Sequence, residues 1–224
     1  MIWSGRHRPH HRNTRELGTA ALGNVSRCGG REGRMRWNMG VDYQQRWSAR
    51  DSVAGFGHGL CDAWAAEYSA ETGLDADDLV VIDPGNGFSY LFDLAGTLRG
   101  VSCSRAPRVV GVWGLSQPGA PGRDHNRMRG HPQPGRSGDD RGHLISCAAG
   151  GGYDINLVPM DAALNRGWSA EGSRFRALER KATATPGTLF FIRAVYQDST
   201  DRPSRARCLA SKTRRASSSC PMRR

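Results

Sequence analysis

The sequence LFFIRAVY at residues 189–196 gives the strongest strand signal in the chain, and it constrains the fold more than any other segment. Its nearly continuous apolar character is typical of a strand that is buried on both faces at the centre of a sheet. A central strand needs a partner on each side, so a further strand should follow it. Residues 203–224 instead hold seven basic residues, no acid and no apolar period, which predicts a disordered tail and an incomplete sheet.

Shorter patterns predict the other elements of an α+β fold with an antiparallel sheet. The predicted strands are 79–82, 88–92, 98–102 and 109–112, with a turn at 83–87 and a long surface loop at 116–138. The predicted helices are 62–68, one that begins at Pro159 and stops before Gly167, and one that begins near Ser173 and stops before Pro186.

Charge is spread unevenly along the 224 residues, whose net charge is +11. The net charge is +7 over residues 1–50, −8 over residues 51–100 and +12 over residues 101–224. The apolar share of 38% is below the roughly 45–50% of globular domains, so part of the chain should not pack. We divide the chain into four segments: a disordered basic arm (1–50), an acidic segment with helical character (51–85), a folded domain (86–202) and a disordered basic tail (203–224).

The basic balance indicates a polyanionic partner, because arginine–phosphate contacts release condensed counterions. The alternative is that much of this charge lies in disordered ends. No apolar run approaches the ~18 residues that a membrane span needs, and the first residues lack the apolar centre of a secretory signal. We therefore expect either secretion by a specialised system or residence in the cytoplasm.

The six cysteines do not form a metal-binding pattern, because none are spaced as CxxC and no suitable histidine pair accompanies them. Free thiols are the expected state, with a disulfide framework as the alternative.

Three short motifs follow one another in the charged C-terminal half: DRGH at residues 140–143, NLVP at 156–159 and LNRG at 164–167. This ordered set resembles the DNA/RNA non-specific endonucleases, the His-Me finger or ββα-metal family, and in particular the branch of type VII secretion EssD-like toxin nucleases. The resemblance covers about residues 86–202, which would then be the nuclease domain with a ββα-metal core. It implies a metal-dependent endonuclease acting on DNA and, in second place, RNA, with an immunity protein as a further partner.

The resemblance also implies roles for individual residues. His143 would be the base that takes a proton from the attacking water, since a neutral imidazole does this near neutral pH. Asn165 would bind Mg²⁺, or Mn²⁺ in its place, through its amide oxygen. Asn156 would orient the histidine or hold the loop, Arg141 would lie near the phosphate, and Glu179 would hold a water of the metal's shell.

The arginines near the third motif, Arg166, Arg174 and Arg176, form a candidate phosphate-binding track. On the outside of a helix such residues are as often simply solvated. Trp168 is either a core residue or a base-stacking platform, and we expect it in the core. The alternative function for the whole chain is a non-catalytic, basic nucleic-acid-binding protein or a truncated, inactive nuclease remnant.

Overall fold

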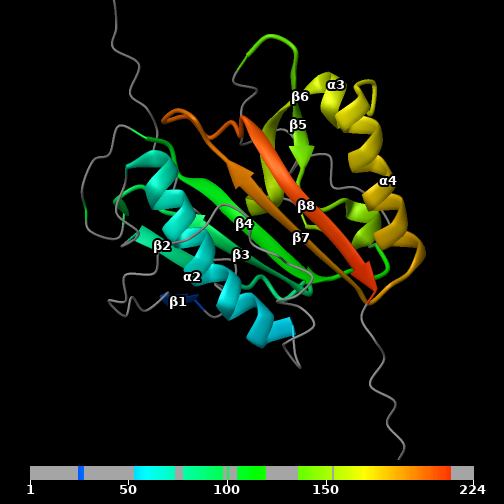
Figure 1. Ribbon diagram of the computed structural model, residues 1–224, viewed down its shortest axis with the longest axis horizontal. Helices are drawn as coiled ribbons and strands as arrows, with labels where there is room; N and C mark the ends of the chain where they lie inside the picture. Colours follow the sequence, from blue (N-terminus) through cyan, green and yellow to red (C-terminus); the bar gives the residue numbers. More distant parts are fainter. Residues whose placement is uncertain are drawn as a thin grey trace, which may run out of the picture.

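The computed structural model describes residues 25–27, 53–73, 78–97, 100, 105–119, 136–152 and 154–212. In this part the chain is an α+β protein built on a six-stranded antiparallel sheet with the strand order β1-β2-β3-β4-β7-β8 (Figure 1). No helix in the described residues is long and apolar enough to cross a membrane. The strands of the sheet are β1 (Val25–Arg27), β2 (Leu79–Ile82), β3 (Phe88–Asp93), β4 (Arg108–Leu115), β7 (Thr188–Val195) and β8 (Arg205–Lys212).

Strand β7 occupies the interior position that its sequence predicts. It pairs with β4 along one edge and with β8 along the other, and all eight of its residues are buried. Phe191 shows the arrangement, because it lies opposite Trp113 of β4 and Leu209 of β8. The prediction of a central strand is therefore confirmed.

Strand β8 corrects the expectation of a disordered tail from residue 203 and of a sheet without its last strand. Residues 205–212 pair with β7 over its full length, from Val195 opposite Arg205 to Thr188 opposite Lys212. An edge strand is ordered by its backbone hydrogen bonds to the neighbouring strand, and charged residues are common in edge strands. The basic composition of residues 205–212 therefore does not exclude a strand.

Strand β1 is a smaller correction of the same kind, because Val25–Arg27 pairs with β2 although we assigned it to the disordered arm. The rest of that arm and residues 213–224 lie outside the described residues, as do most of the predicted strand 98–102 and most of the predicted surface loop. The predicted strands 79–82, 88–92 and 109–112 are confirmed as parts of β2, β3 and β4, and the predicted turn joins the first two.

Helix α2 (Val53–Thr72) is much longer than the predicted helix 62–68. Its glycines lower helix propensity by about 1 kcal/mol each, which explains the short prediction. Packing offsets that penalty at Gly57, where an added Cβ would overlap the indole nitrogen of Trp113. Only glycine lets the helix approach the sheet this closely.

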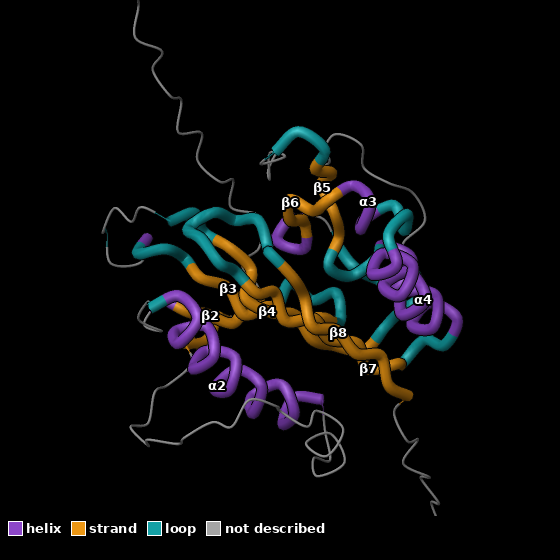
Figure 2. Tube along the Cα trace, turned by 45° about the horizontal axis from the view of Figure 1, so that its top comes forward, coloured by secondary structure: helices purple, strands orange, loops and turns teal. Residues whose placement is uncertain are grey.

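Two apolar clusters lie on the two faces of the sheet. Figure 2 shows helix α2 on one side of the sheet and the segment between β4 and β7 on the other. Helix α2 packs on one face around Trp64, Trp113 and Phe191, and Leu79 of β2 belongs to the same cluster. The acidic segment 51–85 is thus part of the main core. The second cluster lies on the opposite face, beneath the segment between β4 and β7, and includes Tyr90 and Phe190.

The two ends of the segment between β4 and β7 lie next to each other at the sheet. The backbone N–H of Ser116 donates to the carbonyl of Thr188 at 2.8 Å, and the N–H of Thr188 donates to Ser116 Oγ at 3.1 Å. The N–H of Gly187 donates to the carbonyl of Ser116 at 2.7 Å. These contacts fix both ends of the segment that carries the three motifs.

We predict that a chain shortened to end at Ser204 is destabilised by several kcal/mol, a large share of the ~5–15 kcal/mol of an ordinary domain. The cut removes β8, exposes the edge of β7 and takes away the strand on which helix α4 (Ala170–Ala184) packs. A chain ending at Lys212 keeps these contacts and is the matched control. Thermal unfolding followed by circular dichroism should give a clearly lower Tm for the shorter chain, and equal Tm values would contradict the structural role of β8.

Candidate active site

The three motifs form a compact unit of two strands and two helices beside the main sheet (Figure 1). Strand β5 (Asp139–His143) pairs antiparallel with β6 (Leu157–Asp161), and the chain then forms α3 (Ala162–Asn165) and α4 (Ala170–Ala184). Gly142 is required where the strands pack, because an added Cβ would lie 2.7 Å from Met160 Cβ. The glycine of the first motif therefore lets β5 lie tightly against β6.

The predicted helix start at Pro159 is wrong. Pro159 lies inside β6, opposite Arg141, and the helix begins three residues later. In a two-stranded sheet, each strand has an outer edge on which a missing N–H costs no ladder hydrogen bond, so proline is tolerated. Asp161 caps the helix by accepting a hydrogen bond from the N–H of Leu164 at 3.0 Å.

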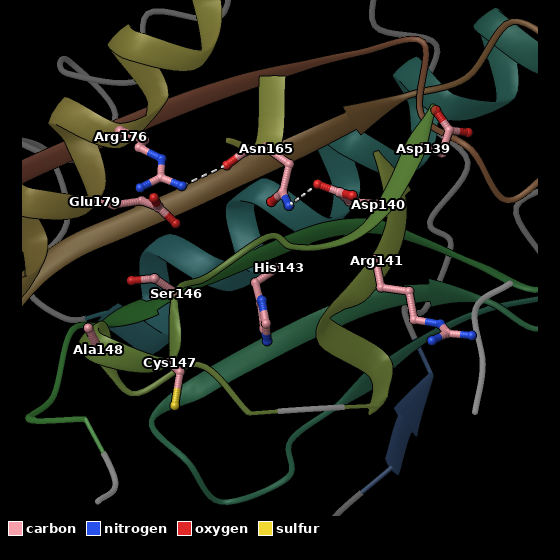
Figure 3. A pocket seen from close by; sticks show the side chains of 10 residues that line it. All are labelled: Asp139, Asp140, Arg141, His143, Ser146, Cys147, Ala148, Asn165, Arg176 and Glu179. Carbon is pink, nitrogen blue, oxygen red and sulfur yellow. Dashed lines mark hydrogen bonds between the residues drawn. The ribbon is translucent and has the colours of Figure 1, made fainter. Parts of the chain in front are cut away.

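A pocket of about 620 Å³ opens where β5, the loop after it, α3 and α4 meet (Figure 3). It brings together five of the residues that the sequence singles out: Arg141, His143, Asn165, Arg176 and Glu179. Its other lining residues are Asp139, Asp140, Ser146, Cys147 and Ala148. Asp140 belongs to the first motif. The sequence gives no separate signal for the other four as pocket residues, although they lie close to that motif.

Asn165 is oriented by the carboxylate of Asp140. Asn165 Nδ2 donates to Asp140 Oδ2 at 3.0 Å, and a carboxylate can only accept, so the amide oxygen must face away from it. Arg166 holds the same carboxylate from outside, with Nε to Oδ2 at 2.9 Å and Nη2 to Oδ1 at 2.7 Å. These hydrogen bonds, those of Arg166 first, hold the pKa of Asp140 below its ordinary value. Asp140 therefore stays ionised and keeps the Asn165 oxygen turned toward the pocket interior (Figure 3).

His143 is the last residue of β5 and lies opposite Leu157 of β6. Its side chain is half-buried, with the Nε2 atom screened from solvent. In Figure 3 the imidazole extends from the strand end and points away from the Asn165 amide, while both residues line the pocket. The end of β5 thus places an imidazole in the same pocket as the Asn165 amide.

Helix α4 adds a carboxylate and a cation to the pocket. Burial raises the pKa of Glu179 above its ordinary value, and the charges of Arg176 and Arg180 offset part of that rise. Arg176 Nη2 donates to the backbone carbonyl of Asn165 at 3.2 Å, which ties α4 to the end of α3. A further cation that approaches such a partly buried carboxylate stabilises its ionised form.

Asn156 does not line the pocket and instead holds the loop behind it. Its side chain is fully buried and accepts from the N–H of Ile145 at 2.9 Å. Its Nδ2 donates to the carbonyls of Ile145 at 2.7 Å and Gly152 at 2.8 Å. Of the two roles expected for Asn156, these contacts match the holding of the loop that follows His143.

Of the remaining predicted site residues, one lines the pocket and two do not. Arg141 lines the pocket, but its guanidinium turns away from Asn165 and Glu179 in Figure 3. Arg166 and Arg174 do not line the pocket: Arg166 is engaged by Asp140, and Arg174 is exposed on α4.

We expected Trp168 in the core, and this prediction is wrong, because 71% of the side chain is exposed.

The described cysteines, Cys61, Cys147 and Cys208, are free thiols, as expected. Cys208 of β8 lies under α4, where burial and then the charge of Glu179 raise its thiol pKa. Helix α4 packs on β8, so β8 supports the helix that carries Glu179.

The polar groups of the pocket suit a hard divalent cation held by few protein ligands. Among the described residues, no group of three or more His, Cys, Asp or Glu side chains is arranged to hold a metal ion. Mg²⁺, however, commonly keeps most of its waters and takes only one or two protein oxygens. The oriented amide oxygen of Asn165 and the buried carboxylate of Glu179 are oxygens of that type.

A scan against models of known protein families finds no match for this chain. A search of curated proteins finds none either.

We predict that Asn156→Ala lowers the free energy of unfolding by about 2–4 kcal/mol, because it leaves buried backbone groups of the loop without hydrogen bonds. Asn165→Ala is the matched control: it removes one half-buried hydrogen bond and should cost less than about 1 kcal/mol. Urea unfolding of both variants measures the difference. Equal losses would show that the two asparagines share one role.

Proposed function

We propose that this protein is a metal-dependent, sequence-non-specific endonuclease of the His-Me finger type, which hydrolyses phosphodiester bonds of DNA and also of RNA. The proposal includes an origin as a bacterial toxin domain with an immunity protein. One observation carries it: a histidine at the end of β5 and an asparagine amide oxygen fixed by Asp140 share a single pocket. The order of strand, strand and helix around that pocket agrees with a ββα-metal core.

The residues of the pocket divide the work of hydrolysis. His143 takes the proton of the attacking water, whose oxygen forms a bond to phosphorus as the bond to the 3′ oxygen breaks. Asn165 would hold Mg²⁺ through its amide oxygen, and Glu179 would hold a water of the metal's shell. The ion would supply positive charge against the negative charge that builds up on the phosphate and the leaving oxygen. Arg176 adds a fixed cation at the pocket wall, and a water protonates the leaving oxygen.

The residues of the pocket also explain why we propose cleavage without preference for a nucleotide sequence. Its side chains address phosphate, water and metal, and contacts of this kind position the backbone without reading base edges. Neither His143 nor Asn165 needs a 2′-hydroxyl to act, so RNA is a second substrate of the same site.

We predict that the full chain nicks supercoiled plasmid in Mg²⁺ or Mn²⁺ and that EDTA abolishes the reaction. His143→Ala should lower the rate by about 10²–10⁴, because a positioned base contributes that much. Asn165→Ala should lose a comparable factor while its melting temperature stays near that of the parent chain. Both variants should still bind DNA in a gel-shift assay.

Two results would contradict the assignment. Undiminished cutting in EDTA would remove the metal from the mechanism. Binding of DNA by the parent chain without any cutting would favour the non-catalytic nucleic-acid-binding protein instead.

We also predict that Asp140→Asn raises the Mg²⁺ concentration needed for half-maximal cutting by about 10- to 100-fold, as expected when a group that orients a metal ligand is lost. An asparagine at this position can donate as well as accept, so it no longer forces the Asn165 oxygen into the pocket. The matched control is Asp139→Asn, since Asp139 lines the same pocket but is engaged by Arg202 at 2.8 and 2.9 Å. An equal shift in both variants would contradict a specific role of Asp140.

A further inference from the structure

Trp168 is the one large apolar side chain that stands exposed in the described part of the chain, with 71% of its surface in solvent. It lies in the turn between α3 and α4, three residues after Asn165. An indole in this position loses most of the free energy that burial would contribute. The exposed ring is therefore accessible to a ligand.

The backbone around Trp168 is held rigidly. The N–H of Trp168 donates to the carbonyl of Ala163 at 2.8 Å, and Ser169 caps α4 by accepting from the N–H of Gly172 at 3.0 Å. The Arg166 guanidinium lies over the indole ring, 4.9 Å from its centroid. The ring is therefore pre-positioned, and its exposure is built into the turn.

Arg166 joins the indole to the pocket wall. The same guanidinium that covers the ring forms two hydrogen bonds to Asp140, which lines the pocket beside Asn165. A chain of contacts therefore leads outward from the pocket, from Asp140 to Arg166 and from Arg166 to Trp168. Exposed basic side chains follow on α4, at Arg174 and Arg176.

We propose that Trp168 is a stacking platform for an unpaired base of the substrate, next to the phosphate held in the pocket. This inference rests on the proposed function and names its substrate class: single-stranded or locally unpaired nucleic acid is bound better than continuous duplex. An aromatic ring flanked by cations is the usual surface for this contact, and it accepts every base because each base has a π-face. Stacking therefore strengthens binding without adding sequence preference.

The test measures binding in EDTA by the full chain, with a fluorescein-labelled single-stranded DNA 12-mer and with the same 12-mer carrying abasic sites at its central positions. Trp168→Ala should weaken binding of the intact strand by about 5- to 150-fold, as a lost base stack does, and should leave the abasic strand almost unaffected. Trp168→Phe keeps an aromatic face and should recover most of the affinity.

Arg174→Ala is the matched control for charge. It should weaken the intact and abasic strands by the same factor, because a phosphate contact does not sense the base. Melting temperatures of the variants exclude loss of fold as the cause.

Equal effects of Trp168→Ala on the intact and abasic strands would overturn the stacking assignment, as would no effect on either. In both cases, Mg²⁺-dependent cutting by the parent chain would leave the proposed nuclease function standing. Absence of both binding and cutting by the parent chain would overturn the two proposals together.

Discussion

The hydrogen bond from Asn165 Nδ2 to the Asp140 carboxylate is the interaction on which the proposed chemistry depends. An asparagine amide has a donor end and an acceptor end of almost the same shape, so only its partners decide which end faces a ligand. Arg166 keeps the carboxylate ionised and fixed by binding both of its oxygens. The result is an amide oxygen presented to the pocket by a side chain that carries no charge of its own.

The main sheet provides the rigid base for this arrangement. The segment with the three motifs is clamped at Ser116 and Thr188, and it packs on the sheet through the apolar cluster opposite α2. Asn156 ties the loop after His143 to β6, while β8 lies beneath α4. Each wall of the pocket is therefore supported by buried contacts outside it, which limits its movement relative to the others.

The sequence predicts those parts of the fold whose order comes from their own residues. The apolar run that becomes β7, the turn after β2 and helix α4 have strong local patterns. The elements that it misses depend on a neighbour. Strand β8 is ordered by pairing with β7, Pro159 is tolerated because β6 has a free edge, and the glycines of α2 become an advantage only once Trp113 packs on Gly57. For the site, the motifs single out His143 and Asn165 and the resemblance adds Glu179, and these three residues line one pocket. The exposure of Trp168 and the pairing of Arg166 with Asp140 follow only from the three-dimensional contacts.

The most direct test of the account is to observe the Asn165 side-chain amide by ¹⁵N-resolved NMR while Mn²⁺ is added to the full chain, with the resonance assigned from the Asn165→Ala variant. If the ion binds at the amide oxygen, this resonance broadens before those of asparagines outside the pocket, such as Asn156, at the Mn²⁺ concentrations that support cutting. An Asn165 resonance that stays sharp while the protein cuts would contradict the assignment of Asn165 as the metal ligand.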